Sequence, residues 1–340
     1  MKIKILVLNI NDLGGIERVA INLYYMFQSN HLLKDNIEIL SVYGSSNEPY
    51  ISILKGSSEN KKLCNLAKSL THDTILLSLY DRFSIKLAIL KKFRKMDFKL
   101  YACQHADYFA HKRYTRFLRN IAYHWVDKII ALTTVDTKLY EKKFKNVCTI
   151  PNTLSFHPEI VSDFVDREID CAVAGRLVPI KQYEHFIEFI KNTHCDGYNY
   201  KIFGDGTEYE KLRRSLDSLG INSNDILVGK TNNIEQYLCE TKFFFVTSLR
   251  ESFSMVILEA MACGCVVISY NCPTGPSELI QHNFNGILVP LNDLDSLTNE
   301  YKRLINDPIS CQTISNNARY FSKSFLMKNI IKLWIKQFND

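Results

Sequence analysis

Two glutamates, Glu251 and Glu259, lie in a stretch whose pattern predicts a loop followed by a helix. If that helix begins near Ser254, its first backbone amides are free donors and its dipole attracts negative charge. Ser252 and Ser254 are residue types that cap such a helix. Each carboxylate can accept two hydrogen bonds from adjacent hydroxyls. The stretch therefore suits a diphosphate with hydroxyl-rich groups on both sides, with Glu259 on a ribose diol and Glu251 on a sugar. Two glutamates at this spacing are also common on an ordinary surface helix.

The elements that position these residues alternate between strands and helices, a pattern that predicts parallel sheets covered by helices. The strands expected in the first half are Ile3–Asn9, Ile37–Val42, Thr74–Leu79, Leu100–Gln104, Lys128–Ala131 and Val147–Ile150. Those expected in the second half are Asp170–Ala174, Asn199–Phe203, Ile226–Val228, Phe243–Val246 and Cys265–Ser269. Helices are expected at Ile16–Gln28, Tyr183–Lys191, Glu208–Leu219, Asn233–Cys239, Met255–Ala262, Ser277–Gln281 and Leu294–Asn306.

The length of 340 residues fits about two domains of ordinary size. We expect a first α/β domain at residues 1–153 and a second at 154–319, joined after Pro151 and Asn152. The helical pattern within residues 320–340 predicts a final helix that crosses back to the first domain. In open sheets of this kind ligands bind beyond the carboxyl ends of the strands, so two such domains facing each other would form a binding cleft.

Charge divides the chain into two different halves. Residues 1–150 carry 24 Lys+Arg and 13 Asp+Glu, whereas residues 151–340 carry 18 and 23. The densest basic stretch, from Arg82 to Arg119, is interleaved with aromatic side chains such as Phe93 and Phe117. This mixture suits anionic lipid headgroups or phosphorylated substrates, and by itself also leaves nucleic acid open. A solvated surface over core aromatics is the alternative.

Segments for export or membrane crossing are not evident. No apolar run approaches the eighteen or more residues of a membrane-spanning helix, and the apolar start Ile3–Ile10 lacks a cleavage site. The ten cysteines are scattered without a C-x-x-C pair, which fits buried thiols in a reducing cytoplasm.

Residues 251–268 read ESFSMVILE followed by AMACGCVVI. This resembles the E-G-F-G-x-x-x-x-E and A-x-A-x-G-x-P-V-I signature of the retaining glycosyltransferases of family 4. Further motifs in the same order extend the resemblance over most of the chain: Gly14-Gly15-Ile-Glu-Arg, Ile150-Pro-Asn152, Ala174-Gly-Arg176 through Lys181, Phe203-Gly-Asp-Gly206 and Gly275-Pro-Ser-Glu278. The resemblance implies the GT-B fold, in which two Rossmann-like doubly wound domains face each other across a cleft. It assigns the acceptor to the first domain and the nucleotide-sugar donor to the second.

The resemblance also implies roles for individual residues. Arg176 and Lys181 would bind the donor diphosphate, where preplaced cations stabilise the charge that develops as the nucleoside diphosphate leaves. His105, directly after an expected strand, would orient the donor sugar and can contact the acceptor; a structural histidine is the alternative. The remaining expected donor contacts are Gly15, Gly204, Ser252, Phe253, Ser254, Met255, Glu251 and Glu259. Simple turns at the glycines, and core packing of Phe253 and Met255, are the competing interpretations.

Several positions depart from the family pattern. Ser252, Ser254 and Gln182 stand where glycine is common, and Val266 stands where proline is common. Serine and glutamine allow less backbone freedom than glycine. These departures leave the identity of the sugar open. A nominal D-x-D, Asp293-Leu-Asp295, lies before an expected helix, where a cap explains it better than a metal site, so no metal and no cofactor are expected.

The resemblance therefore implies a retaining, metal-independent hexosyltransferase. It would move a hexose or N-acetylhexosamine, with UDP favoured as the carrier, onto a bacterial glycan or lipid-linked oligosaccharide. We expect a cytoplasmic enzyme that is peripheral on the inner face of the cell membrane, with an anionic membrane surface as a partner, and the resemblance disfavours nucleic acid. Two alternatives stay open: a UDP-sugar epimerase of the same architecture, and a non-catalytic subunit that binds nucleotide sugars.

Overall fold

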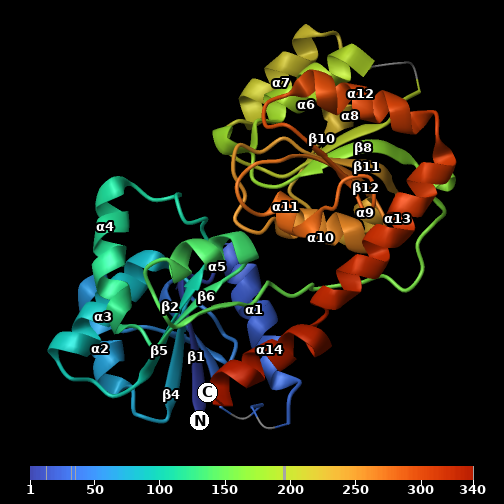
Figure 1. The fold of residues 1–340 in the computed structure, drawn as a ribbon. Coiled ribbons are helices and arrows are strands. Elements are labelled where there is room, and N and C mark those ends of the chain that lie inside the picture. The colour runs from blue at the N-terminus through green and yellow to red at the C-terminus, as the bar shows by residue number, and fades with distance from the viewer. Residues whose placement is uncertain (13, 32, 35, 194–196, 340) are drawn as a thin grey trace. The chain divides into compact units, whose positions relative to one another are not determined.

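The computed structural model describes residues 1–12, 14–31, 33–34, 36–193 and 197–339, and divides into two compact units (Figure 1). The first unit comprises Met1–Thr153 together with the segment from Met327 onward, and the second comprises Leu154–Leu326. Each unit is a parallel β-sheet with helices packed on both of its faces. The predicted α/β class with two Rossmann-like doubly wound units is confirmed.

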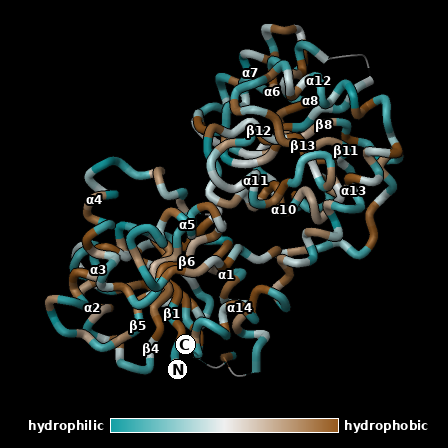
Figure 2. The backbone as a smooth tube through the Cα atoms, in the orientation of Figure 1, coloured by the Kyte–Doolittle hydropathy of each residue, from teal (hydrophilic) through white to brown (hydrophobic). Residues whose placement is uncertain are grey.

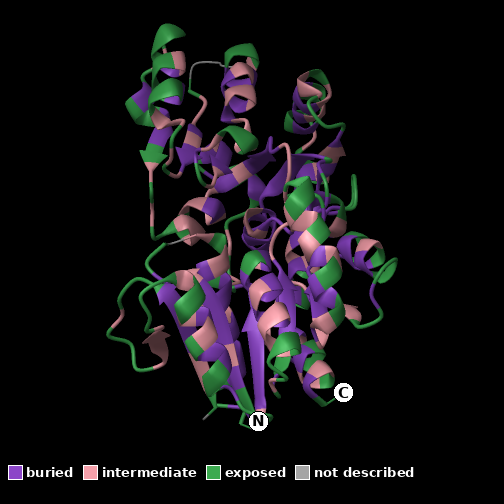
Figure 3. Cartoon of the chain, turned by 90° about the vertical axis from the view of Figure 1, so that its left-hand side faces the viewer, coloured by how far each residue is buried: buried purple, intermediate pink, exposed green. Residues whose placement is uncertain are grey.

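The sheet of the first unit has seven parallel strands in the order β3-β2-β1-β4-β5-β6-β7. The strands are β1 (Lys2–Asn9), β2 (Ile37–Tyr43), β3 (Ile51–Ile53), β4 (Thr74–Ser78), β5 (Lys99–Gln104), β6 (Lys128–Ala131) and β7 (Val147–Thr149). Apolar residues dominate these strands, which are largely brown in Figure 2, as expected of a sheet covered on both faces. Figure 3 shows the result around the N-terminus, where the strands are buried and the helices expose their outer faces.

The helices of the first unit include one from the far end of the chain. They are α1 (Gly15–Gln28), α2 (Glu59–Ser69), α3 (Asp81–Phe93), α4 (Arg113–Ala122), the 3₁₀ helix η1 (Tyr123–Trp125), α5 (Thr134–Glu141) and α14 (Met327–Asn339). α14 buries Trp334 and Phe338, and both rings contact Phe27 of α1 at centroid distances of 5.6 Å. The backbone carbonyl of Gln337 accepts a 2.9 Å hydrogen bond from the Tyr101 hydroxyl of β5. These apolar and polar contacts attach the last helix to the first unit.

The sheet of the second unit has six parallel strands in the order β10-β9-β8-β11-β12-β13. The strands are β8 (Ile169–Ala174), β9 (Tyr200–Phe203), β10 (Leu227–Gly229), β11 (Thr241–Val246), β12 (Val266–Tyr270) and β13 (Ile287–Val289). The α-helices are α6 (Tyr183–Thr193), α7 (Tyr209–Ser218), α8 (Ser223–Ile226), α9 (Ile234–Cys239), α10 (Met255–Ala262), α11 (Pro276–Leu279), α12 (Leu294–Ile305) and α13 (Pro308–Ser322). The 3₁₀ helices are η2 (Phe164–Asp166), η3 (Pro179–Lys181) and η4 (Lys323–Phe325).

The predicted strands and helices are confirmed with shifts of one or two residues at their ends, and α10 has the predicted bounds. The three-residue edge strands β3 and β13 were not predicted, although β7 and β10, which are equally short edge strands, were. The prediction of one final helix within residues 320–340 is wrong for the residues that the structure describes. α13 ends at Ser322, and the extended backbone of Leu326 (φ −63°, ψ 147°) separates η4 from α14. The segment that joins the first unit therefore begins at Met327 rather than at residue 320.

None of the described helices is both long enough and apolar enough to cross a membrane. The nine described cysteines are free thiols, and six of them are buried. The tenth, Cys195, lies outside the described residues.

Candidate active site

The candidate site lies at the carboxyl edge of the second unit's sheet, between β8 and β11. These strands are neighbours, yet β9 and β10 continue the sheet on one side while β12 and β13 continue it on the other. Loops from such neighbours diverge, which leaves a crevice where doubly wound sheets bind their ligands. The loop after β8 carries Lys181, and the loop after β11 carries Glu251. Two residues 70 positions apart are thereby brought to one point.

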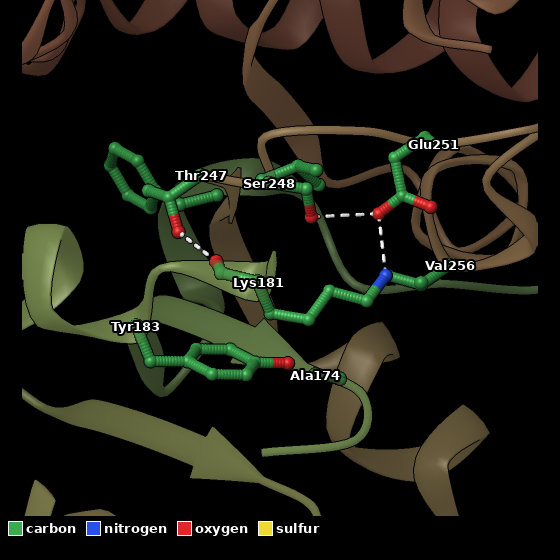
Figure 4. Close-up of a pocket in the computed structure, with 9 residues that line it drawn as sticks. Ala174, Lys181, Tyr183, Thr247, Ser248, Glu251 and Val256 are labelled. Atoms are coloured by element: carbon green, nitrogen blue, oxygen red, sulfur yellow. Dashed lines mark hydrogen bonds and ion pairs between the residues drawn. The ribbon is translucent and has the colours of Figure 1, made fainter. Parts of the chain in front are cut away.

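Lys181 and Glu251 form an ion pair across this crevice. The Lys181 Nζ lies 2.6 Å from the Glu251 Oε1, and the Ser248 hydroxyl donates a 2.8 Å hydrogen bond to the same oxygen (Figure 4). The side chains of Lys181 and Glu251 are 20% and 9% exposed. The pair lines a small pocket together with Tyr183, Thr247 and other residues at the ends of β8 and β11. A partly exposed ammonium at this position can reach an anion without leaving the protein surface.

The backbone of the β8–α6 loop is held on two sides. Leu177 donates its N–H to the Asp205 carbonyl at 2.9 Å, and its own carbonyl accepts the Glu208 N–H at 2.9 Å. On the other side the Thr247 hydroxyl donates to the Lys181 carbonyl at 2.9 Å. These hydrogen bonds hold the backbone of the loop, including Lys181 at the end of η3, independently of the contacts of the Lys181 side chain. Gln182 follows with a left-handed backbone (φ 47°), which favours glycine.

Gly204 is required by close packing between the ends of β8 and β9. Its φ is +138°, and a Cβ there would lie 1.8 Å from the Gly175 carbonyl oxygen. Gly206 is similarly confined, since a Cβ would lie 2.3 Å from the Leu177 carbonyl oxygen. Packing within the chain is therefore sufficient to explain Gly204, as the simple-turn interpretation expects. A donor contact at Gly204 stays a prediction.

α10 begins at Met255, beside the Lys181–Glu251 pair. The backbone amides of Met255 and Val256 have no acceptor within the helix, because the first turn of any α-helix lacks one. Glu259 lies about one turn further on and is 4% exposed. A free helix start, a cation and a buried carboxylate within one segment can together hold a diphosphate and a neighbouring diol.

The expected capping of α10 by serine is wrong for Ser254. Ser254 occupies the N-cap position, but its backbone is left-handed (φ 69°), and its buried hydroxyl forms no hydrogen bond with the described residues. The first-turn amides of α10 are therefore not occupied by the Ser254 hydroxyl.

The neighbouring residues of the same loop differ in their surroundings. Phe253 is 1% exposed, and its ring packs on Phe325 at a centroid distance of 5.8 Å, so the side chain belongs to the core. Ser252 and Met255 are partly exposed. The Ser252 carbonyl accepts a 3.3 Å hydrogen bond from the Thr274 hydroxyl. The packing interpretation thus fits the Phe253 side chain. A ligand could contact this residue only through the backbone of the loop.

Arg176, the second expected cation, follows β8 and is exposed. Within the described part of the chain its guanidinium forms no hydrogen bond or ion pair. Tyr183, by contrast, lies in the pocket wall, where burial and then the negative charge of Glu251 raise its pKa above the ordinary value. The Tyr183 hydroxyl is therefore neutral, and Arg176 and Lys181 are the two cations of the loop between β8 and α6.

Gly15 and His105 belong to the first unit. Gly15 is the first residue of α1, and a Cβ there would meet no atom within 4 Å, so packing inside the chain does not require glycine. His105 directly follows β5, and its Nε2 is buried without a hydrogen-bond partner among the described residues. Burial lowers the pKa of His105 to about 4, although the charge of Asp81 opposes the shift, so the imidazole is neutral near pH 7.

Comparison with known proteins shows what the chain is similar to. Residues 161–321, which make up nearly all of the second unit, match the family "Glycosyl transferases group 1". The chain is a homologue of group 1 glycosyltransferases. The amylovoran biosynthesis glycosyltransferase AmsD of Erwinia amylovora is 25% identical over 98% of each chain. The GalNAc-alpha-(1->4)-GalNAc-alpha-(1->3)-diNAcBac-PP-undecaprenol alpha-1,4-N-acetyl-D-galactosaminyltransferase of Campylobacter jejuni is 27% identical over 99% of this chain and 98% of its own.

Solved structures agree on the fold. The crystal structure of HepE from Anabaena in complex with UDP and glucose aligns with a TM-score of 0.83 at 18% identity over 100% of both chains. At that identity the likeness establishes the fold alone. The two parallel-sheet units are therefore those of the GT-B glycosyltransferase fold.

Three residues of this candidate site were not among the expected site residues. Ser248 bonds Glu251, Thr247 anchors the Lys181 backbone, and Tyr183 lines the pocket. Thr247 and Ser248 are the first two residues after β11, so their place at the carboxyl end of a strand was a usable signal. The nominal D-x-D has the capping role that was expected: Asp293 Oδ1 accepts the Ser296 N–H at 2.9 Å and caps α12.

Proposed function

We propose that this glycosyltransferase homologue moves a hexose or N-acetylhexosamine from a nucleotide diphosphate, with UDP favoured, onto a bacterial glycan or lipid-linked acceptor. The observation that carries the proposal is the Lys181–Glu251 pair beside the free start of α10, at the point where the second sheet's strand order reverses. A diphosphate fits this place because a cation and backbone amides converge on it.

In this mechanism the protein stabilises the departing diphosphate. Lys181 and Arg176 lie on the loop after β8, and the first amides of α10 add donors that need no reorganisation. Glu259 accepts the ribose hydroxyls, and Glu251 orients Lys181 and a sugar hydroxyl. Because protein groups supply this charge stabilisation, we propose transfer without a metal ion and without a cofactor.

We further propose that the anomeric configuration is retained. The acceptor oxygen attacks the anomeric carbon on the face from which the diphosphate leaves. The bond between that carbon and the diphosphate oxygen breaks, and the acceptor proton passes to the departing oxygen. Glu251, the carboxylate nearest to the pocket, is already bonded to Lys181 and Ser248, which disfavours a covalent sugar intermediate on it.

Relatives support the acceptor class. AmsD is named for the synthesis of amylovoran, and the Campylobacter relative is named for a glycan linked to undecaprenol through a diphosphate. HepE, which shares the fold, binds UDP and glucose in its crystal. The epimerase and the non-catalytic subunit are not favoured by these names.

Membrane attachment is the second part of the proposal, and α4 supports it. Tyr114, Phe117 and Ile121 recur at helical spacing, and these side chains are 72%, 61% and 43% exposed. Exposed Lys112 and Arg113 flank this stripe. Aromatic side chains next to cations suit the interface of an anionic bilayer, which would place the enzyme peripherally on the inner face of the cell membrane.

A panel of UDP-, GDP- and ADP-sugars tests the function. We expect a UDP-hexose or UDP-N-acetylhexosamine to raise the melting temperature most, and the same donor to release UDP when a glycan acceptor is added. Chromatography of the sugar product separates transfer from epimerisation. Stabilisation by none of the donors, or conversion of a UDP-sugar to its epimer without transfer, contradicts the proposal.

Sedimentation with liposomes tests the attachment. We expect binding to phosphatidylglycerol vesicles at low salt, weaker binding at high salt, and loss of binding in a Phe117→Ser variant. Tyr320→Ser is the matched control, because Tyr320 is 77% exposed but lies on α13 of the other unit. Equal binding to neutral and anionic vesicles removes the membrane proposal.

A further inference from the structure

A buried ionic cluster lies at the carboxyl edge of the first unit's sheet. Asp81, the first residue of α3 after β4, has a side chain that is only 3% exposed. Its Oδ1 accepts a 2.8 Å hydrogen bond from the Tyr123 hydroxyl. Its Oδ2 lies 2.8 Å from the His111 Nε2 and accepts a 3.4 Å hydrogen bond from Arg119, whose side chain is fully buried. One carboxylate thus holds groups from three different segments.

The same cluster also holds the segment of residues 105–112, which connects β5 to α4, through hydrogen bonds to its backbone. The Arg119 guanidinium donates to the Tyr108 carbonyl at 2.9 Å, and the Tyr108 N–H donates to Asp136 of α5 at 3.0 Å. The Arg119 guanidinium also lies over the rings of Tyr108 and Tyr140, at 4.6 and 5.0 Å. Figure 1 shows α3 and α4 side by side, with this segment leading into α4. The segment that begins with His105 is therefore fixed by α3, α4 and α5.

His111 differs from the other members of the cluster because it is partly open to solvent. Its Nε2 is buried toward Asp81, yet 32% of its side chain is exposed. An imidazole with one nitrogen fixed by a buried carboxylate and the rest of the ring accessible is the arrangement that orients a histidine toward a ligand. Burial by itself raises the pKa of Asp81, but His111, Arg119 and Tyr123 lower it below its usual range, so the carboxyl is ionised.

Stability alone is a poor explanation for such a cluster. Apolar side chains of similar volume are commonly as stabilising as a buried ion pair, because the charges must be desolvated. An ion pair does fix geometry, since each hydrogen bond has a direction. The hydrogen bonds and ion pairs of this cluster surround a partly exposed histidine, at the sheet edge where doubly wound folds bind ligands. This arrangement indicates that the cluster positions His111.

We propose that His111 contacts the sugar acceptor and that Asp81 is its positioning residue. The inference rests on the proposed glycosyl transfer and assigns part of the acceptor site within the first unit. The His111 ring offers a hydrogen bond to a hydroxyl or phosphate oxygen of the acceptor, and adjacent Lys112 and Arg113 add positive charge for a phosphorylated one.

The test separates the acceptor from the donor. Wild type and His111→Ala are assayed for two reactions of a UDP-sugar: hydrolysis by water, and transfer to a synthetic acceptor in which a diphosphate joins an N-acetylhexosamine to a short prenyl chain. We expect transfer kcat/KM to fall about 10- to 100-fold, mainly through the acceptor KM, while hydrolysis stays within about twofold. His72→Ala is the matched control, because His72 is exposed and precedes β4 at the opposite edge of the sheet.

Asp81 is tested by Asp81→Asn, with Tyr123→Phe as a second variant, because loss of the carboxylate leaves the buried Arg119 unpaired and can prevent folding. We expect both variants to raise the acceptor KM while the donor KM is unchanged, and the Asp81→Asn effect to be nearly absent in a His111→Ala background. Full transfer by His111→Ala, or an equal loss of hydrolysis and transfer, overturns the inference. A wild type that releases no UDP from any UDP-sugar overturns instead the proposed function on which it rests.

Discussion

In each unit two side chains interact across the point where the strand order of the sheet reverses, through an ion pair in one unit and a hydrogen bond in the other. The surroundings of these two pairs differ. In the second unit Lys181 and Glu251 meet beside a pocket, and the lysine is 20% exposed. In the first unit the Tyr80 hydroxyl donates a 2.6 Å hydrogen bond to Glu17, which is 4% exposed. At the same topological position, the second sheet therefore has a partly exposed lysine, Lys181, and the first has a buried glutamate, Glu17.

The surroundings of each pair extend this difference. Beside Lys181 lie glycine turns and the free amides of α10, which suit a diphosphate. Beside Tyr80 lies Asp81, whose partners Arg119, His111 and Tyr123 already satisfy its carboxylate. The second unit is therefore arranged to receive negative charge, and the first to hold a segment in place. Each variant below changes one side of this contrast.

Loss of Lys181 is expected to have the largest effect. Lys181→Ala removes the cation proposed to stabilise the departing diphosphate, so we expect kcat to fall about 100- to 1000-fold with a small change in donor affinity. Steady-state transfer kinetics measure the change. Lys191→Ala on α6 is the control, because its ion pair with Glu188 is exposed. A kcat close to that of wild type contradicts the role given to Lys181.

Glu259 is expected to act on binding rather than on turnover. Glu259→Ala removes a buried carboxylate proposed to accept ribose hydroxyls, and charged hydrogen bonds of this kind contribute about 1.5–3 kcal/mol. Donor affinity should therefore fall roughly 10- to 100-fold by calorimetry. Glu210→Ala, which changes an exposed residue of α7, should bind the donor like wild type. Unchanged affinity in Glu259→Ala would exclude the ribose contact.

Local pattern was sufficient to predict most of the strands, whereas α2, α3, α4, α5, α8 and α13 were not among the expected helices. The apolar run Ile3–Asn9 became β1, and α10 has its predicted bounds because its apolar residues and start signal are local. The short edge strands β3 and β13 were not predicted, and each is held by pairing with one neighbouring strand, β2 and β12 respectively. The break at Leu326 likewise follows from packing, since Phe325 is held against Phe253.

The candidate site was predictable as a set of residues but not as a set of contacts. Lys181 and Glu251 were each expected at the site with separate roles, whereas their ion pair depends on the adjacency of β8 and β11. Asp81 and Arg119 are 38 positions apart, and the sequence alone did not indicate that they interact. Asp81 and Arg119 are buried because α3 packs against α4, and neither segment's sequence shows that packing by itself.

His105 tests the first unit through pH. Burial lowers its pKa from 6.5 to about 4, so between these values the unfolded chain binds a proton that the folded chain does not. Protonation of His105 in the unfolded chain therefore has little effect on the free energy of unfolding above pH 6.5. Below pH 6.5 it lowers that free energy progressively as the pH falls toward 4. We expect the contribution of His105 at pH 5.5 to be about 1 kcal/mol smaller than at pH 7.5. Urea unfolding of His105→Asn should show a weaker decline over this range, and a decline as steep as that of wild type contradicts the buried neutral imidazole.

The smallest expected effect concerns Gln182 and Ser254, the two left-handed residues on the loops that carry Lys181 and Glu251. Ser254 (φ 69°) and Gln182 (φ 47°) occupy positions where glycine has no steric cost, so Ser254→Gly and Gln182→Gly should each stabilise folding by about 1 kcal/mol in urea. Ser252→Gly is the matched control, because Ser252 is in the same loop without a positive φ, and there glycine only adds freedom to the unfolded chain. If all three variants are destabilised alike, the left-handed backbone at 182 and 254 is not a source of strain. Stabilisation at only those two positions would instead show that strain is concentrated around the pair that distinguishes this sheet edge from the other.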